Sequence, residues 1–167
     1  MADVDPGTRS PWDSVAFMLS TLGYAVSRRF FEALAPAGLE PRQFLVLRTI
    51  ALEEGPSQQA LARRLQIPKS RMVAIVDGLE RRGLLERRRN PGDRRAHALH
   101  LTEEGQALTR TAFRRAVEHE QRITSSLGAD ERRQLLDLLA RIATDLGIPR
   151  ATHSALADPP GRKRPGR

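Results

Sequence analysis

Closely spaced chain breakers make residues 57–102 the most constrained part of this sequence, because only short helices and strands fit between them. Ser57 can cap a first helix, and Pro68 suits the first turn of a second helix that ends at Gly83. The turn Asn-Pro-Gly-Asp at 90–93 separates two short segments that are typical of strands. Helix, turn, helix and hairpin in this order predict a winged helix-turn-helix.

The positive charge of the chain is concentrated on the same segment. Residues 57–102 hold 11 Lys and Arg and 4 acids, a net charge of +7, and the tail at 148–167 carries +4. The segments 1–56 and 103–147 are slightly acidic, at −2 and −1. Because a concentrated basic patch on a compact module indicates a polyanion partner, we expect double-stranded DNA.

The composition excludes several classes of protein. The chain of 167 residues is long enough for a real core and has no cysteine, which excludes disulfides, thiolate metal sites and thiol catalysis. No apolar run approaches the roughly 20 residues of a membrane span, and Asp3 and Asp5 are untypical of a signal peptide. We therefore expect a soluble, cytoplasmic protein with no membrane partner.

Long apolar helices flank the winged helix-turn-helix. The pattern from Trp12 to about Leu34 predicts one helix, and Thr102 can cap a helix that runs to about Ser126. The first helix has more apolar surface than one face can bury, so another helix or a second subunit must cover it. The fold class is mainly α with a small β-wing. The expected units are a flexible N-terminus at 1–11, dimerisation helices at 12–36 and 103–147, a DNA-binding winged helix-turn-helix at 37–102 and a disordered basic tail at 148–167.

The predicted helix at 68–82 has two different faces. Its apolar residues recur at helical spacing and must face the core; they are Met72, Ile75, Val76 and Leu79. The opposite face has the short side chains of Ser70, Val73 and Ala74, with Lys69 and Arg71 at the N-terminal end. Short side chains flanked by cations suit close approach to a major groove. An ordinary solvent-facing helix is the alternative that this pattern leaves open.

The predicted hairpin, with strands at 84–89 and 96–101, gathers arginines near its tip. They are Arg87, Arg88, Arg89, Arg94 and Arg95. An arginine at such a tip can enter a narrow minor groove, where the negative potential is enhanced. We expect Asp93 to orient Arg94 or Arg95 by an ion pair, and Asp77 to hold Arg95 from the preceding helix. A solvated edge hairpin is the alternative.

Residues 40–105 resemble the MarR family of winged-helix regulators. The resemblance is carried by the motif at 59–65, the run at 76–87, and the wing pattern Asp93-Arg94-Arg95 followed by Leu99, Leu101-Thr102 and Gly105. It implies an obligate homodimer with interlocking terminal helices, a helix at 68–82 that reads the major groove, and a wing-tip Arg94 in the minor groove, braced by Asp93 and Arg95. It also implies a pocket, often for anionic aromatic compounds, between the dimer helices and the DNA-binding lobe.

Two positions depart from the family pattern. Gln66 stands where the family often has Gly, and a left-handed Gln costs about 1 kcal/mol. His97 stands where the family usually has an aliphatic residue, so we expect that strand to be less buried.

We therefore expect a homodimeric, sequence-specific transcriptional regulator, a repressor, that binds a pseudo-palindromic duplex and is released by a small aromatic or anionic effector. A low-specificity architectural DNA-binding protein and a winged helix that binds another protein are the alternatives. The predicted DNA-binding residues are Ser57, Gln58, Gln59, Pro68, Lys69, Ser70, Arg71, Val73, Ala74, Arg88, Arg89, Arg94 and Arg95. The predicted wing-bracing residues are Asp77 and Asp93.

We expect no enzyme activity, cofactor or metal site. His97 and His100 point to opposite faces of a strand, and the neighbours of His119 diverge around a helix, so no metal ligand set forms. Neither a Gly-rich phosphate loop nor a Ser-His-Asp spacing is present. Six aromatic residues could line an effector pocket, although such residues more often belong to the core: Trp12, Phe17, Tyr24, Phe31, Phe44 and Phe113.

Overall fold

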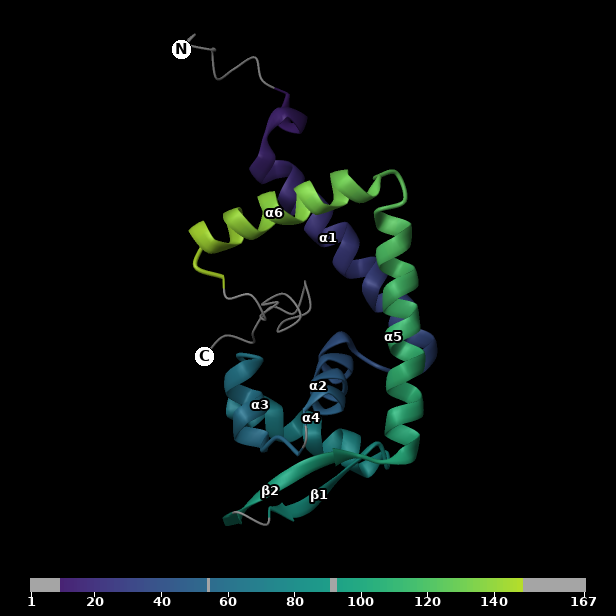
Figure 1. Ribbon diagram of the computed structural model, residues 1–167, viewed down its shortest axis with the longest axis vertical. Helices are drawn as coiled ribbons and strands as arrows, with labels where there is room; N and C mark the ends of the chain where they lie inside the picture. Colours follow the sequence, from purple (N-terminus) through teal and green to yellow (C-terminus); the bar gives the residue numbers. More distant parts are fainter. Residues whose placement is uncertain (1–9, 54, 91–92, 149–167) are drawn as a thin grey trace, which may run out of the picture.

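The computed structural model describes residues 10–53, 55–90 and 93–148, with the backbone alone at 11, 90 and 93–96 (Figure 1). This part of the chain is mainly helical with a two-stranded wing, as predicted. The elements in chain order are η1 Pro11–Asp13, α1 Val15–Leu34, η2 Ala35–Ala37, α2 Pro41–Leu52, α3 Gln58–Arg64, α4 Lys69–Arg81, β1 Leu85–Asn90, β2 Asp93–Leu101, α5 Glu103–Ile123 and α6 Ala129–Asp145.

The winged helix-turn-helix lobe consists of α2, α3, α4 and the antiparallel hairpin of β1 and β2. Its core is apolar and closed to solvent, because side chains from each of these elements have exposed fractions of 2% or less: Leu47, Leu61, Met72, Leu79, Leu85 and Leu99. Ser57, just before α3, forms an isolated bridge with Ala98 of β2. This bridge joins the start of the helix-turn-helix to the wing.

Hydroxyl caps and one strained turn set the helix boundaries in this lobe. The Ser57 hydroxyl accepts a hydrogen bond from the Ala60 amide at 3.1 Å, which starts α3 as predicted. Between α3 and α4, Gln66 has a φ of 50°, so this turn residue is left-handed and its side chain adds about 1 kcal/mol of strain. Pro68 is the residue before α4 rather than its first residue.

Several predicted boundaries shift by a few residues. Helix α1 begins at Val15, because the Ser14 hydroxyl accepts from the Phe17 amide at 3.3 Å, and Trp12 belongs to η1. Strand β2 begins at Asp93, three residues earlier than predicted, because Asp93 still pairs with Asn90 across the hairpin. Strand β1 begins at Leu85, one residue later than predicted. Helix α5 ends at Ile123, before the predicted Ser126.

Helix α5 connects the two ends of the molecule. It runs from the wing to the opposite end, where α6 turns back across α1 (Figure 1). Its lower end is joined to the lobe by Thr102, whose hydroxyl donates to the Gly83 carbonyl at 2.6 Å and accepts from the Gly105 amide at 3.0 Å. Gly105 lies so close to the backbone of Leu84 that a Cβ there would come within 1.8 Å of the Leu84 carbonyl oxygen.

The far end of the molecule is much more apolar on its surface than the lobe. Leu22 of α1 is 51% exposed and Leu136 of α6 is 59% exposed. Apolar residues of both helices line one open groove of about 500 Å³, among them Met18, Leu19, Leu138 and Ile142. The excess apolar surface predicted for the first helix is therefore present, and in this single chain it remains uncovered.

Candidate DNA-binding surface

Helix α4 has the two faces that the sequence predicts. Met72, Val76 and Leu79 are fully buried, while Ser70, Val73 and Ala74 are exposed. Lys69 at the first turn is exposed as well, and Arg71 is half-buried. The exposed face thus consists of short side chains next to a cation, which lets a nucleic-acid backbone or base edge approach closely.

The predicted residues of α3 have different surroundings. Gln59 is exposed and lines a small hollow of about 300 Å³ together with Lys69 and Val73 of α4. Ser57 is half-buried and serves as the cap described above. Gln58 is half-buried, and its side-chain oxygen accepts from Arg87 of the wing. The structure therefore brings Gln59 to the face of α4 and turns Gln58 towards the hairpin.

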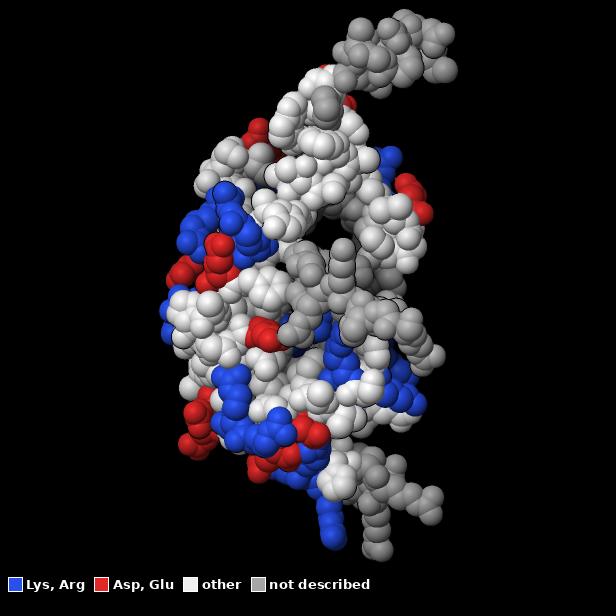
Figure 2. All heavy atoms as spheres, turned by 180° about the vertical axis from the view of Figure 1, so that it is seen from behind, with Lys and Arg blue, Asp and Glu red and all other residues white. Residues whose placement is uncertain are grey.

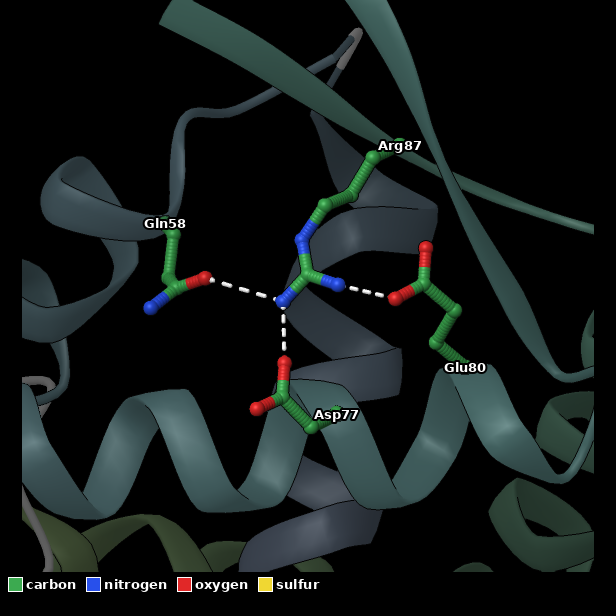
Figure 3. A network of polar contacts seen from close by, with 4 residues as sticks. All are labelled: Gln58, Asp77, Glu80 and Arg87. Carbon is green, nitrogen blue, oxygen red and sulfur yellow. Dashed lines mark hydrogen bonds and ion pairs between the residues drawn. The ribbon is translucent and has the colours of Figure 1, made fainter.

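Arg87 of β1 ties the wing to α4 (Figure 3). Its guanidinium donates to Asp77 at 2.5 Å, to Glu80, and to Gln58 at 3.4 Å. The Arg87 side chain is only 26% exposed, so this network is partly screened from water. It connects three elements and sets the position of the hairpin relative to α4.

Asp77, predicted to brace the wing, pairs with Arg87, which was not among the predicted site residues. A signal for Arg87 exists in the alternation of the strand. Arg87 lies two residues after the buried Leu85, so both side chains point towards α4. The side chain of Arg95, the partner predicted for Asp77, lies outside the described residues, as do those of Asp93 and Arg94.

The remaining wing arginines differ from Arg87. Arg88 is exposed and pairs with Glu86 of the same strand at 2.5 Å, and Arg89 is exposed without an acidic partner among the described side chains. On strand β2, His97 is exposed whereas Ala98 and Leu99 are buried, so the lower burial expected for this strand is limited to His97. Figure 2 shows Lys and Arg side chains interleaved with acidic ones at the end of the molecule that carries the wing.

A second hollow lies on the other side of the lobe, between α2, α5 and β2. It has a volume of about 710 Å³ and is lined by Arg48, Arg88, Arg110, His100 and Phe113, among others. The Arg48 guanidinium lies 4.1 Å from the centre of the Phe113 ring, in cation–π contact. Of the six aromatic residues considered for a pocket, Phe113 lines this hollow, whereas Phe44 is buried in the core.

The described part of the chain lacks two other kinds of site. No group of three His, Asp or Glu side chains gathers there in a way that could hold a metal ion. None of the described helices is long and apolar enough to cross a membrane.

A helix-turn-helix with an exposed face of short side chains, tied by an arginine to a basic hairpin, defines a DNA-binding winged helix-turn-helix. Residues 37–96 match the sequence model of the MarR family. The HTH-type transcriptional regulator PecS of Dickeya dadantii is 30% identical over 131 residues, which are 77% of this chain and 79% of PecS. The chain belongs to the MarR family, and it is therefore a transcriptional regulator rather than an enzyme.

Solved structures agree with this assignment. The transcriptional repressor CouR, bound to a 23-mer DNA duplex, is 37% identical with a TM-score of 0.72, and the match covers 85% of this chain and 99% of that one. CouR from Rhodococcus jostii RHA1, bound to p-coumaroyl-CoA, is 33% identical with a TM-score of 0.70, and the match covers 81% and 96%.

Proposed function

We propose that this protein is a homodimeric repressor that binds a pseudo-palindromic DNA duplex and releases it when an aromatic, anionic effector binds. The observation that carries the proposal is the exposed face of α4, with Ser70, Val73 and Ala74 beside Lys69, in a fixed relation to the wing through Arg87. Two such lobes related by a two-fold axis would enter successive major grooves about 34 Å apart. Such a regulator acts in the cytoplasm, where it meets DNA.

DNA recognition is divided between base reading and phosphate contact in this proposal. Ser70, Val73, Ala74 and Gln59 are placed to meet base edges, and Lys69, Arg71 and Arg89 to meet phosphates. Arg94 is proposed to enter the flanking minor groove of each half-site, with Asp93 and Arg95 bracing it. CouR bound to a DNA duplex supports this docking, because the match covers nearly the whole of that chain.

The test is a selection of bound sequences from random duplex DNA, followed by fluorescence anisotropy at fixed salt. Ser70→Ala should weaken binding to the selected duplex more than to a scrambled one, and Lys69→Ala should lower the salt slope by about one. Arg81→Gln is the matched control, because it removes an equally exposed charge from the last turn of α4. Equal affinity for selected and scrambled duplexes would indicate an architectural protein. The absence of duplex binding would indicate a protein-binding module.

Dimerisation is proposed to cover the apolar groove between α1 and α6. Water-exposed apolar patches of this kind mark contact surfaces. Leu138→Asp in the groove should shift the molecular mass in analytical ultracentrifugation from dimer to monomer. Leu52→Asp on α2 is the control, since Leu52 is 65% exposed and lies outside the groove. A Leu138→Asp variant that remains dimeric would place the subunit contact elsewhere.

The effector is proposed to bind in the hollow between α2, α5 and β2. Arg48, Arg88 and Arg110 supply positive charge there, and Phe113 supplies an aromatic surface. The complex of CouR with p-coumaroyl-CoA supports an aromatic acyl thioester or its carboxylic acid as the ligand class. In the anisotropy assay p-coumaroyl-CoA should weaken duplex binding, and Arg110→Gln should reduce this response while leaving duplex affinity unchanged. An unaltered response in Arg110→Gln would exclude this hollow.

A further inference from the structure

A third hollow, separate from the DNA-binding face and from the proposed effector site, lies between the second half of α5 and the end of α1. It has a volume of about 460 Å³, which is in the range of sites that hold small ligands. Its charged lining consists of Arg29 and Glu32 from α1 and of Arg115, Glu118 and Arg122 from α5, with the imidazole of His119 between them.

The guanidinium groups of this hollow stand apart from the ion pairs of the chain. Among the described residues, no ion pair or hydrogen bond engages the guanidinium of Arg29, Arg115 or Arg122. The nearby Glu32 lies 3.9 Å from Arg28 instead. Three guanidinium groups without a described ion pair therefore gather around one hollow.

His119 is the buried member of the group. It is 6% exposed, its ring lies 5.5 Å from that of Phe30, and its Nε2 has no hydrogen-bond partner among the described residues. Burial lowers the pKa of His119 below its usual 6.5, and the charges of Arg122 and Arg29 lower it further, while Glu120 raises it. The imidazole therefore senses the positive charge of the hollow directly.

The hollow lies on the polar side of α5. Arg115, Glu118 and Arg122 recur at a spacing of three and four residues and share one flank of the helix. The exposed apolar residues of α5, Phe113 and Val117, are also four apart and lie on the opposite flank, the side of the α2–α5 hollow. None of the described residues that line this hollow lines the apolar α1–α6 groove proposed as the subunit contact, so the two surfaces are separate.

We propose that this hollow binds the phosphate group of a small metabolite, at a site distinct from that of the aromatic effector. A phosphate monoester carries nearly two negative charges and three strong acceptor oxygens, and each oxygen can accept from one guanidinium. A carboxylate carries only one negative charge, so it balances the three guanidinium groups less well. Glu32 and Glu118 reduce the net positive charge of the hollow, which disfavours a polyanion such as DNA more than a single phosphate group.

The test follows the imidazole proton signals of His119 by NMR, in the full-length protein, as inorganic phosphate or glycerol phosphate is added. A dianion between Arg29 and Arg122 offsets their repulsion of the imidazolium, so the pKa of His119 should rise on binding. Acetate and chloride at matched ionic strength should not produce this rise. Tighter binding of glycerol phosphate than of inorganic phosphate would identify an organic phosphate as the ligand, and the reverse order would identify the free ion.

The variant that tests the site is Arg115→Gln combined with Arg122→Gln. It should weaken phosphate binding by at least about tenfold, because two of the three charge-assisted contacts are lost. Arg114→Gln removes a charge from the adjacent position of α5 outside the hollow and should bind phosphate as the unaltered protein does. The proposal is overturned if chloride moves the His119 pKa as much as phosphate does, or if the double variant binds phosphate normally. Loss of the dimer in the double variant would also overturn it, since these arginines would then belong to a subunit contact.

Discussion

Replacing Arg87 by Met tests whether the wing is held against α4 by the network of Figure 3. Methionine keeps an apolar stem of similar length and removes the guanidinium that donates to Asp77, Glu80 and Gln58. The substitution therefore separates loss of the charged contacts from loss of packing. It also leaves two carboxylates, Asp77 and Glu80, one turn apart on α4 without their shared cation.

The expected loss of unfolding free energy depends on how far the three charged side chains of the network are exposed to solvent. The side chains of Arg87, Asp77 and Glu80 are 26%, 41% and 37% exposed, so solvent screens both ion pairs in part. Solvent-exposed ion pairs contribute about 0.2–1 kcal/mol each, and hydrogen bonds to charged groups that are shielded from water contribute about 1.5–3 kcal/mol. We expect Arg87→Met to lose about 1–2 kcal/mol of unfolding free energy, or about 3–6 °C of Tm for a chain of this size. DNA affinity should fall about tenfold, because binding must then order the wing as well.

The assays are thermal unfolding followed by circular dichroism, and anisotropy with the selected duplex. Arg89→Gln is the matched control, because Arg89 is the next residue on the same strand face, is exposed, and has no described acidic partner. It should weaken DNA binding through lost charge while its Tm changes little. A double-mutant cycle with Asp77→Asn should give a coupling of at least about 0.5 kcal/mol. If Arg87→Met unfolds like Arg89→Gln and the coupling is zero, the network does not hold the wing.

Three further substitutions test the joints of the fold. Gly105→Ala should lose about 3 kcal/mol or more of unfolding free energy, because its Cβ would lie 1.8 Å from the Leu84 carbonyl oxygen. The control Gly78→Ala meets nothing within 4 Å and should be neutral or stabilising. Equal stability of the two variants in thermal unfolding would contradict this packing. Gln66→Gly should raise the unfolding free energy by up to about 1 kcal/mol, because glycine adopts a φ of 50° without strain. The greater entropy of the unfolded glycine chain offsets part of this gain. A loss of stability would show that the turn is unstrained. Because the pKa of His119 is lowered in the folded state, the unfolded chain binds a proton first as the pH falls below 6.5, so stability should decrease with falling pH and then level off below the folded pKa. His119→Gln should flatten this part of the profile, as measured by urea unfolding between pH 5 and 7.5, and an unchanged slope would assign it to other groups.

The patterns that repeat along one element were enough to predict that element. The burial of Met72, Val76 and Leu79, and the exposure of Val73 and Ala74, follow from the helical period alone. At Gln66 the sequence indicated the cost of a left-handed conformation, because the family often has Gly at this turn position, but it did not decide the conformation itself. The start of β2 was placed too late because its register depends on Asn90 across the hairpin, which no local pattern reveals.

Contacts between distant residues were the part that the sequence could not supply. Arg87 bonds to Asp77 on the preceding helix and to Gln58 on the helix before that. From the sequence alone, any of several nearby arginines was an equally good partner for Asp77 or Gln58. Arg48 and Phe113 stack although α2 and α5 are separated by the whole helix-turn-helix and wing. Such contacts depend on how the helices pack in three dimensions. The hollow that Arg48 and Phe113 line could therefore not be predicted from residue spacing along the chain.

The joint at Thr102 and Gly105 gives the long helix above it a mechanical role. The Thr102 hydroxyl bonds to both Gly83 and Gly105, and Gly105 packs directly on the Leu84 backbone. The winged helix-turn-helix and the first turn of α5 are therefore held in a nearly fixed orientation. Helix α5 has 21 residues and is about 31 Å long. A tilt of about 5° at its upper end moves the lower end by about 3 Å, close to the rise of one base pair. A change in how the terminal helices pack would therefore displace the winged helix-turn-helix by about one base pair without any contact to it.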